Sequence, residues 1–247
     1  MKVGILGGAF NPPHTGHLLL ANFAIEKLGL DKFIFIPTAN PSHKQISEGW
    51  DAGMRSLMIK IASFNLPPHA LEKILLKEKI FCITDASDKP GSTQIYNMVF
   101  IWFMETYTKL YFLHHEHKIS VSDMEISRGG VSYTVDTVEE LLKKDPSMEL
   151  YLIIGQDQAR DFDKWKDYEK IAEFAKVYVA ARGENNINEL KMRFKFMNFL
   201  DTPRFDISSS EIRKRYKEGN IIDYYLPEIM SVFIRCKSVR ERFVTEK

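Results

Sequence analysis

The chain has 247 residues, enough for one α/β domain with a large buried core and short for two independent domains. Its 34 basic and 33 acidic residues leave a formal net charge of +1, which argues against duplex nucleic acid or a membrane surface as a partner. Two cysteines without metal-ligand spacing, and a first strand with no apolar leader before it, favour a reducing cytoplasm and a small-molecule partner.

Strand-like and helix-like stretches alternate along most of the chain. In order, the hydrophobic spacing predicts strand 2–6, helix 16–28, strand 33–36, helix 51–64, strand 119–125, helix 134–144, strand 149–154, helices near 157–174, strand 177–181, helix 187–195, helix 208–218 and helix 227–236. This alternation predicts an α/β fold with a doubly wound, Rossmann-like parallel sheet. Ligands of such sheets bind beyond the carboxyl ends of the strands, where the strand order reverses.

One long segment, 65–118, interrupts the alternation within what we expect to be a single domain over 1–247. It contains a polar turn at 85–92 and an aromatic-rich helical stretch at 94–115, so we expect a mostly helical insertion. The aromatic side chains are too many for a solvated helix and need a surface to pack on, either the rest of the chain or another subunit of a homo-oligomer. Near the end of the segment stand three histidines that fit either a polar helix end or a metal cluster: His114, His115 and His117.

The first expected strand leads into a glycine turn with two histidines after it. The run is Gly7-Gly8-Ala9-Phe10-Asn11-Pro12-Pro13-His14-Thr15-Gly16-His17. Glycines directly after a buried strand let the backbone approach a ligand closely, because no Cβ stands in the way. His14 and His17 project from one side of a first helical turn, where exposed N–H groups favour an anion. Taken alone, this spacing fits a phosphate site, a helix start packed by histidines, or an H-x-x-H metal site with no third ligand nearby.

This run closely resembles the signature of the nucleotidyltransferases that carry an H-x-G-H motif, above all the nicotinate mononucleotide adenylyltransferases of NAD synthesis. Four later segments are similar to segments of that family: Asn40-Pro41-Ser42-His43-Lys44, Ser132-Tyr133-Thr134, Gly155-Gln156-Asp157 with Trp165 shortly after, and Ile207-Ser208-Ser209-Ser210-Glu211-Ile212-Arg213. The segment 65–118 departs from the family, whose connection at this place is short.

The resemblance assigns residues to the reaction and to each substrate. Catalysis is expected of His14, His17, Lys44 and Arg213. ATP binding is expected of Gly7, Gly8, Ala9, Phe10, His17, Gly155, Asp157, Ile207, Ser208, Ser209 and Arg213. Mononucleotide binding is expected of Asn11, Lys44, Ser132, Tyr133, Thr134, Trp165 and Arg182. Mg²⁺ is the implied cofactor, and we expect no metal site built from protein ligands.

Several of these residues also have ordinary structural explanations. Ser208 and Glu211 fit a capping box at a helix start, and Asp157 fits a helix N-cap. Trp165 fits a half-buried aromatic side chain, although a flat pyridinium would stack well on its ring. Arg55, which resembles a family arginine in an R-x-x-M pattern, also fits an ion pair with the acidic residue four positions before it.

The expected reaction joins ATP and nicotinate mononucleotide to give nicotinate adenine dinucleotide and pyrophosphate, a step of NAD biosynthesis. Other H-x-G-H transferases are alternatives, with nicotinamide mononucleotide or phosphopantetheine as acceptor, or with CTP and a glycerol or choline phosphate. A non-catalytic nucleotide-binding sensor or assembly subunit is an alternative of a different class. The sequence does not place the N–H donors or the cation that would separate the acid form of the pyridine from the amide form.

Overall fold

The computed structural model describes residues 1–42, 46–78, 80, 92–113, 118–181, 187–203 and 206–245. The polar turn predicted at 85–92 lies outside this part of the chain except for its last residue, and so do Lys44, His114, His115, His117 and Arg182.

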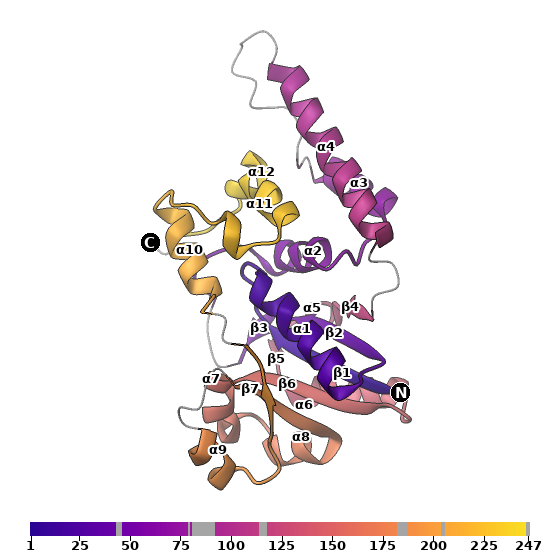
Figure 1. The fold of residues 1–247 in the computed structure, drawn as a ribbon, viewed down its shortest axis with the longest axis vertical. Coiled ribbons are helices and arrows are strands. Elements are labelled where there is room, and N and C mark those ends of the chain that lie inside the picture. Colours follow the sequence, from indigo (N-terminus) through magenta and orange to yellow (C-terminus); the bar gives the residue numbers. More distant parts are fainter. Residues whose placement is uncertain are drawn as a thin grey trace.

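A parallel six-stranded sheet organises the lower half of the molecule as drawn in Figure 1. Its strands, in their spatial order, are β4 (Ile119–Val121), β2 (Lys32–Pro37), β1 (Lys2–Gly8), β6 (Glu149–Gly155), β7 (Ala175–Ala181) and β8 (Asn198–Asp201). Ile5 of β1 lies between Ile34 of β2 and Leu152 of β6. The parallel pairing confirms the predicted doubly wound sheet. The strand order reverses between β1 and β6, so a ligand is expected at the carboxyl ends of these two strands.

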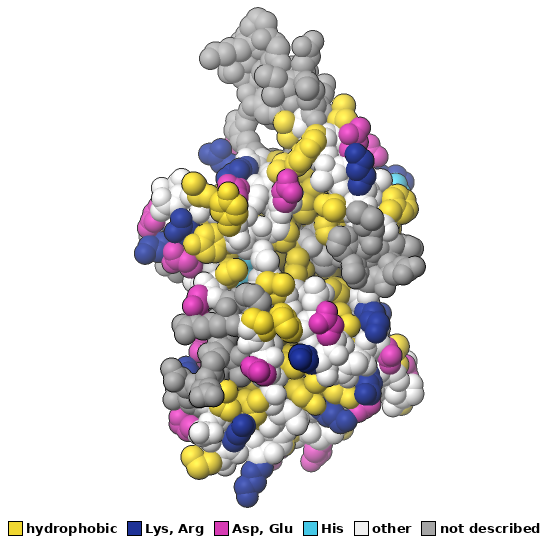
Figure 2. Space-filling view, in the orientation of Figure 1, with side chains coloured by type: hydrophobic (Ala, Val, Ile, Leu, Met, Phe, Trp, Pro, Cys, Tyr) yellow, Lys and Arg dark blue, Asp and Glu magenta, His cyan; other side chains and the backbone are white. Residues whose placement is uncertain are grey.

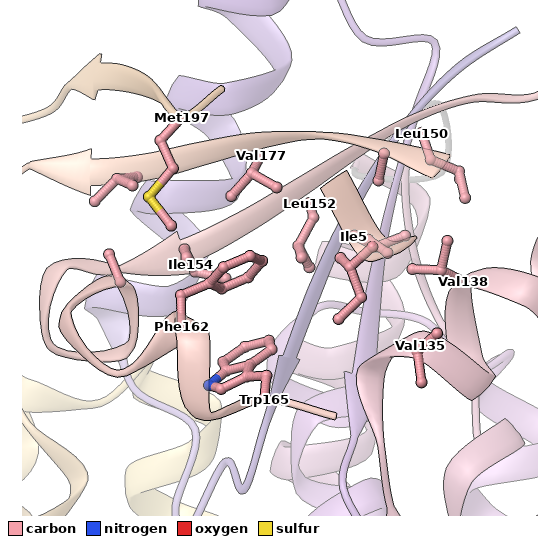
Figure 3. Close-up of a cluster of buried hydrophobic side chains, with 14 of the residues drawn as sticks. Ile5, Val135, Val138, Leu150, Leu152, Ile154, Phe162, Trp165, Val177 and Met197 are labelled. Atoms are coloured by element: carbon pink, nitrogen blue, oxygen red, sulfur yellow. The ribbon is translucent and has the colours of Figure 1, made fainter. Parts of the chain in front are cut away.

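Helices cover both faces of the sheet. On one face lies α1 (Thr15–Leu28), and on the other lie α6 (Thr134–Lys144), α7 (Gln156–Arg160), η1 (Phe162–Lys164), α8 (Tyr168–Phe174) and α9 (Ile187–Arg193). Each face of the sheet packs against its helices in a separate hydrophobic core. Alternate side chains of β2 enter the two cores: Phe33 and Phe35 pack with α1, while Ile34 and Ile36 pack with α6. Figure 3 shows part of the core on the α6 face of the sheet. Among the helices of the described ranges, none is both long and apolar enough to cross a membrane.

A third core joins helices from the middle and the end of the chain. It involves α2 (Ala52–Ala62), α3 (Pro68–Lys77), α4 (Ser92–Leu113), α10 (Ser209–Lys217), η2 (Asp223–Tyr225), α11 (Glu228–Arg235) and α12 (Lys237–Arg240). Phe103 and Tyr107 of α4 are fully buried in it, and the Tyr107 hydroxyl donates to the Leu66 carbonyl at 2.9 Å. One face of the aromatic-rich helix therefore packs on its own chain. The assignment of 1–247 to a single domain stays a prediction.

The structure differs from the predicted elements in several places. The predicted strand 119–125 stops at Val121, because the short helix α5 (Met124–Arg128) follows it. Three short strands were not predicted from the sequence: β8, β3 (Asn40–Pro41) and β5 (Val131–Ser132), the last two of which pair with each other. Strands of two to four residues carry no usable hydrophobic period, so only their partners reveal them.

The segment Glu48-Gly49-Trp50 ties the glycine turn to the C-terminal part of the chain. The Asn11 side chain donates to the Glu48 carbonyl at 2.7 Å and accepts from the Trp50 backbone N–H at 3.0 Å. The Trp50 indole N–H donates to the Val239 carbonyl at 2.8 Å, and Gly49 forms a backbone bridge with Val244. Gly49 has a φ of +107°, and a Cβ there would lie 2.2 Å from Asn11 Oδ1. Glycine is required here because both the conformation and the space exclude a side chain.

A side chain at Gly49 would meet both an unfavourable φ and a steric clash with Asn11, and a comparison with Gly219 separates the two effects. Gly219 has a φ of +72° with open space where a Cβ would stand, so Gly219→Ala introduces backbone strain only. We expect Gly219→Ala to lower the free energy of unfolding by about 1 kcal/mol and Gly49→Ala to lower it by about 3 kcal/mol or more. Urea unfolding followed by circular dichroism measures both values. Equal losses in the two variants would show that the close approach to Asn11 is unimportant.

Candidate functional site

A cavity of about 270 Å³ lies where the strand order reverses. Six of the residues predicted to bind ATP or the mononucleotide line it: Gly7, Gly8, Ala9, Ser132, Thr134 and Trp165. We name it the glycine-turn cavity. A larger cavity of about 830 Å³ lies between α10 and the C-terminal segment, and none of the predicted site residues lines it. The chemistry of the lining, rather than the volume, therefore selects the candidate site.

His14 and His17 stand together at the start of α1. Their rings stack with centroids 3.7 Å apart, and Phe10 packs edge-on against His17 at 5.0 Å. The backbone N–H of His14 donates to Nδ1 of His17 at 3.1 Å, so a neutral His17 ring carries its proton on Nε2. A Cβ at Gly16 would lie 3.1 Å from His14 Nδ1, so glycine leaves room for the stacked rings. The H-x-G-H run thus caps a helix and provides an imidazole N–H donor at the same time.

The N-terminus of α10 meets the glycine turn. Ser208 caps this helix, as predicted, by accepting a backbone N–H of its first turn at 3.1 Å. The Ser209 hydroxyl donates to the Pro12 carbonyl at 2.9 Å, and Nη1 of the buried Arg213 donates to the Asn11 carbonyl at 2.9 Å. The two strongest motifs of the sequence are therefore in direct contact. Hydroxyl groups, a helix N-terminus and a guanidinium group lie together there, a combination that suits a polyphosphate.

Glu48 orients the guanidinium of Arg213. Arg213 Nε donates to one Glu48 carboxylate oxygen at 3.0 Å, and Lys217 Nζ donates to the other at 2.6 Å. The hydrogen bonds from Lys217 and Arg213 hold the pKa of Glu48 below its usual value. Arg213 Nη2 lies 3.5 Å from Ser210 Oγ. Because the guanidinium is already fixed, it loses little freedom when it binds an anion.

Arg55 is a buried cation that fastens the loops of the site. It is 2% exposed, and its guanidinium donates at 2.6 to 3.2 Å to four backbone carbonyls, those of Ala9, Thr38, Ala39 and Trp50. Burial lowers the pKa of Arg55 to about 10, so the group stays charged at neutral pH. Asp51 instead caps α2 by accepting the Met54 N–H at 2.9 Å. The N–H groups of Arg55 thus bind backbone carbonyl groups, and the ion pair with Asp51 that the sequence suggested does not form.

Trp165 and Ser132 form part of the cavity wall. Trp165 is 8% exposed, so it is buried rather than half-buried, and its ring packs on Phe162 with centroids 5.0 Å apart (Figure 3). The Ser132 hydroxyl accepts the Ala39 N–H at 3.3 Å. The Tyr133 ring carries the Lys166 ammonium at 4.7 Å. One aromatic face and several small polar groups therefore border the cavity, which suits a planar heteroaromatic ring.

Glu125 is a buried acid in the same wall that the sequence analysis missed. It is 5% exposed and accepts from the Thr137 hydroxyl at 2.8 Å. Burial raises the pKa of Glu125, and hydrogen bonds from the hydroxyls of Thr137, Ser132 and Thr38 oppose that rise. The available signal was an acidic residue at the end of the predicted strand 119–125.

The remaining predicted residues lie around this centre. Asp157 is in the first turn of α7 and pairs with Arg160 at 3.1 Å, with 91% of its side chain exposed. Gly155 is the N-cap residue of α7, so the N-cap explanation of Asp157 is wrong. Ile207 packs against the third core. The roles of Lys44 and Arg182, outside the described ranges, stay predictions.

Within the described ranges, no group of three or more His, Cys, Asp or Glu side chains could hold a metal ion. Glu48 is engaged by Arg213 and Lys217, and Glu125 by hydroxyl groups. A divalent cation at this site would have to take most of its oxygen ligands from a substrate and from water.

Comparison with known proteins identifies the family. A model of the cytidylyltransferase-like family matches residues 5–215. The chain belongs to this family. A relative from Dictyoglomus turgidum, named "Probable nicotinate-nucleotide adenylyltransferase", is 38% identical over 244 residues, which is 97% of this chain and 95% of the relative. A relative of the same name from Borreliella afzelii is 34% identical over 227 residues, 92% of this chain and 90% of its own. The resemblance seen in the sequence is confirmed.

Solved structures of other proteins confirm the fold. Plasmodium falciparum nicotinic acid mononucleotide adenylyltransferase complexed with NaAD aligns with a TM-score of 0.60 at 18% identity, over 94% of each chain. The same protein complexed with APC aligns with a TM-score of 0.59 at 17% identity. At these identities the likeness concerns the fold alone. The cytidylyltransferase-like fold is therefore kept even though this chain contains the segment 65–118.

The second prediction concerns Glu125 and pH. Because its pKa is raised in the folded protein, the folded state keeps this proton to a higher pH than the unfolded state does. The free energy of unfolding should therefore fall as the pH rises through the folded-state pKa, above the ordinary value of 4.5. Glu125→Gln should remove that decline. Urea unfolding of both proteins from acidic to neutral pH measures the difference.

Glu173→Gln, at an exposed position of α8, is the matched control and should follow the wild-type curve. Parallel curves for the wild type and Glu125→Gln would contradict the prediction.

Proposed function

We propose that this protein is a nicotinate-nucleotide adenylyltransferase, which joins ATP and nicotinate mononucleotide to give nicotinate adenine dinucleotide and pyrophosphate. The observation that carries the proposal is the contact of Ser209 and Arg213 with the glycine turn that leads into His14 and His17. It gathers cationic, hydroxyl and imidazole donors next to a cavity with an aromatic wall. The names of the relatives from Dictyoglomus and Borreliella support the same activity.

The proposed reaction is a direct nucleotidyl transfer. An oxygen of the mononucleotide 5′-phosphate forms a bond to the α-phosphorus of ATP, and the bond from that phosphorus to the bridging oxygen of the departing pyrophosphate breaks. The attacking phosphate is already anionic at neutral pH, so the reaction needs no protein nucleophile. The protein has to align two anionic substrates and stabilise the charge that develops between them.

We assign the ATP side to the glycine turn and α10. His17, through its Nε2–H, and His14 would face the α-phosphate and the bridging oxygen. Arg213 and the hydroxyl groups at the start of α10 would hold the β- and γ-phosphates, together with Lys44. The backbone of 7–10, with Gly155 and Asp157, would border the adenosine.

We assign the pyridine ring to the glycine-turn cavity. Trp165 offers an aromatic surface, and Ser132 and Thr134 line the cavity beside it. Helix α6 begins at Thr134, so its first backbone N–H groups lie at the cavity and favour a carboxylate over a neutral amide. This supports the nicotinate form of the substrate. Asn11, Tyr133 and Arg182 are the further residues proposed for the mononucleotide.

We propose that Mg²⁺ enters with the triphosphate, because phosphate oxygens supply the ligands that it prefers. Both substrates are small molecules, and we propose that the reaction takes place in the cytoplasm.

The third prediction tests the substrates. Release of pyrophosphate is measured with ATP and, in parallel, nicotinate mononucleotide, nicotinamide mononucleotide and phosphopantetheine, and with CTP and glycerol phosphate. We expect sustained turnover with ATP and nicotinate mononucleotide and a lower kcat/KM with each alternative. A higher kcat/KM for another acceptor would replace the proposed substrate, and binding of ATP without turnover in any mixture would favour a nucleotide sensor.

The fourth prediction separates the capping role of His17 from its catalytic role. In His17→Asn, the side-chain oxygen can still accept the His14 N–H, but the ring Nε2–H is lost. We expect an unchanged circular dichroism spectrum and a turnover lower by about 10²- to 10³-fold, the usual loss for one transition-state contact. His69→Asn, on the exposed surface of α3, is the matched control and should keep normal turnover. Normal turnover of His17→Asn would contradict the assignment.

A further inference from the structure

Helix α4 carries a second, exposed stripe opposite the face that it buries. Ile101, Trp102 and Phe112 are 54%, 42% and 67% exposed, and the exposed residues Glu105 and Lys109 lie among them. On a helix of 3.6 residues per turn these five positions fall within an arc of about 100°. Phe103 and Tyr107 point to the other side, into the third core. We name the five residues the α4 stripe.

Three of the five residues of the α4 stripe are large apolar side chains that are exposed. Figure 1 shows α4 extending along the long axis of the molecule, and Figure 2 shows hydrophobic side chains over it beside acidic and basic ones. Clustered exposed apolar side chains flanked by charges are typical of a protein interface. Within the described ranges, Glu105 and Lys109 form no ion pair with another residue of this chain, so both charges are available to a partner.

The order of residues in the stripe is self-complementary. Trp102 and Phe112 lie five positions on either side of Tyr107, and Glu105 and Lys109 lie two positions on either side of it. If two α4 helices run antiparallel about a twofold axis at the level of Tyr107, each Trp102 faces the other helix's Phe112. Each Glu105 then faces the other helix's Lys109. A twofold interface requires such a match of one surface with itself, and a parallel pairing would instead place like charges together.

We infer that the α4 stripe is the surface through which two copies of this chain form an antiparallel dimer. A hollow of about 520 Å³ lies beside the stripe. It lies between α3 and α4, and its lining includes Glu105, Lys109 and Met104 together with Pro68 and His69.

The interface is short. From Ile101 to Phe112 the stripe spans about 17 Å of helix. Two helices that meet over this length bury a surface area at the low end of the range for specific interfaces. We therefore expect a dimer that dissociates on dilution. The charge pairs fix its antiparallel register, and the aromatic pairs supply most of its affinity.

The test uses charge reversal on the full chain. Glu105→Lys places two lysines opposite each other at both ends of the pair, and Lys109→Glu does the same with two glutamates, so each variant alone should be a monomer. Mixed in equal amounts, the two variants should form a heterodimer, because every Lys then faces a Glu. The double variant Glu105→Lys with Lys109→Glu should dimerise like the wild type. Light scattering after size-exclusion chromatography and sedimentation velocity give the mass at each concentration.

Trp102 supplies an independent readout. It is 42% exposed, whereas Trp50 and Trp165 are 1% and 8% exposed, so a change in tryptophan exposure on dimerisation comes from Trp102. The wild type should show a blue shift of its fluorescence as concentration rises from micromolar to hundreds of micromolar. Trp102→Phe should lack this shift. Lys143→Glu, on the exposed surface of α6, is the matched charge control and should leave the dimer intact.

Three results would overturn the inference. A wild type that is monomeric at every concentration would show that some other molecule, or none, covers the stripe. A dimer that survives both single reversals would use another surface. Failure of the two monomeric variants to associate when mixed, with circular dichroism spectra like that of the wild type, would exclude the antiparallel charge pairing.

Discussion

The hydrogen bond from Arg213 to the Asn11 carbonyl is the contact on which the rest of the site depends. It is 2.9 Å long and joins positions that are 202 residues apart in the chain. Glu48 holds the same guanidinium from another side, and the Asn11 amide in turn binds the backbone at Glu48 and Trp50. Because each of these groups has more than one partner, a change at one of them should be felt at the glycine turn and at α10 together.

Two buried arginines hold loops that apolar packing cannot hold. The first residues of the glycine turn, Gly7, Gly8 and Ala9, have little side chain to bury, since bulky groups would exclude a ligand from the cavity. Arg55 and Arg213 replace that missing packing by donating to backbone carbonyls, which would otherwise be buried without partners. Arg213 differs from Arg55 in having a carboxylate, Glu48, that orients it beside the hydroxyl groups of α10. One buried cation therefore serves the fold, and the other also serves the proposed phosphate site.

The segment 65–118 contributes both to the fold and to the outer surface. Phe103 and Tyr107 complete the third core, which also contains Trp50 and Ile212 from elements next to the site. The opposite face of α4 leaves Trp102 and Phe112 exposed. Packing on the same chain, one of the two explanations offered for the aromatic residues, applies to one face of α4, and the proposed packing on another subunit would apply to the opposite face.

The sequence by itself determined the parallel sheet, the glycine turn after β1, the start of α1 and the Ser208 cap of α10, because each depends on neighbours within a few residues or on a regular hydrophobic period. Tertiary structure alone decided the partners of Glu48, the burial of Glu125 and the need for glycine at position 49. It also decided the strand β8. This strand has only four residues, too few for a recognisable hydrophobic pattern, and its pairing with β7 defines it. These features depend on groups brought together from distant parts of the chain, and a residue's local sequence carries no record of the partner that it will meet.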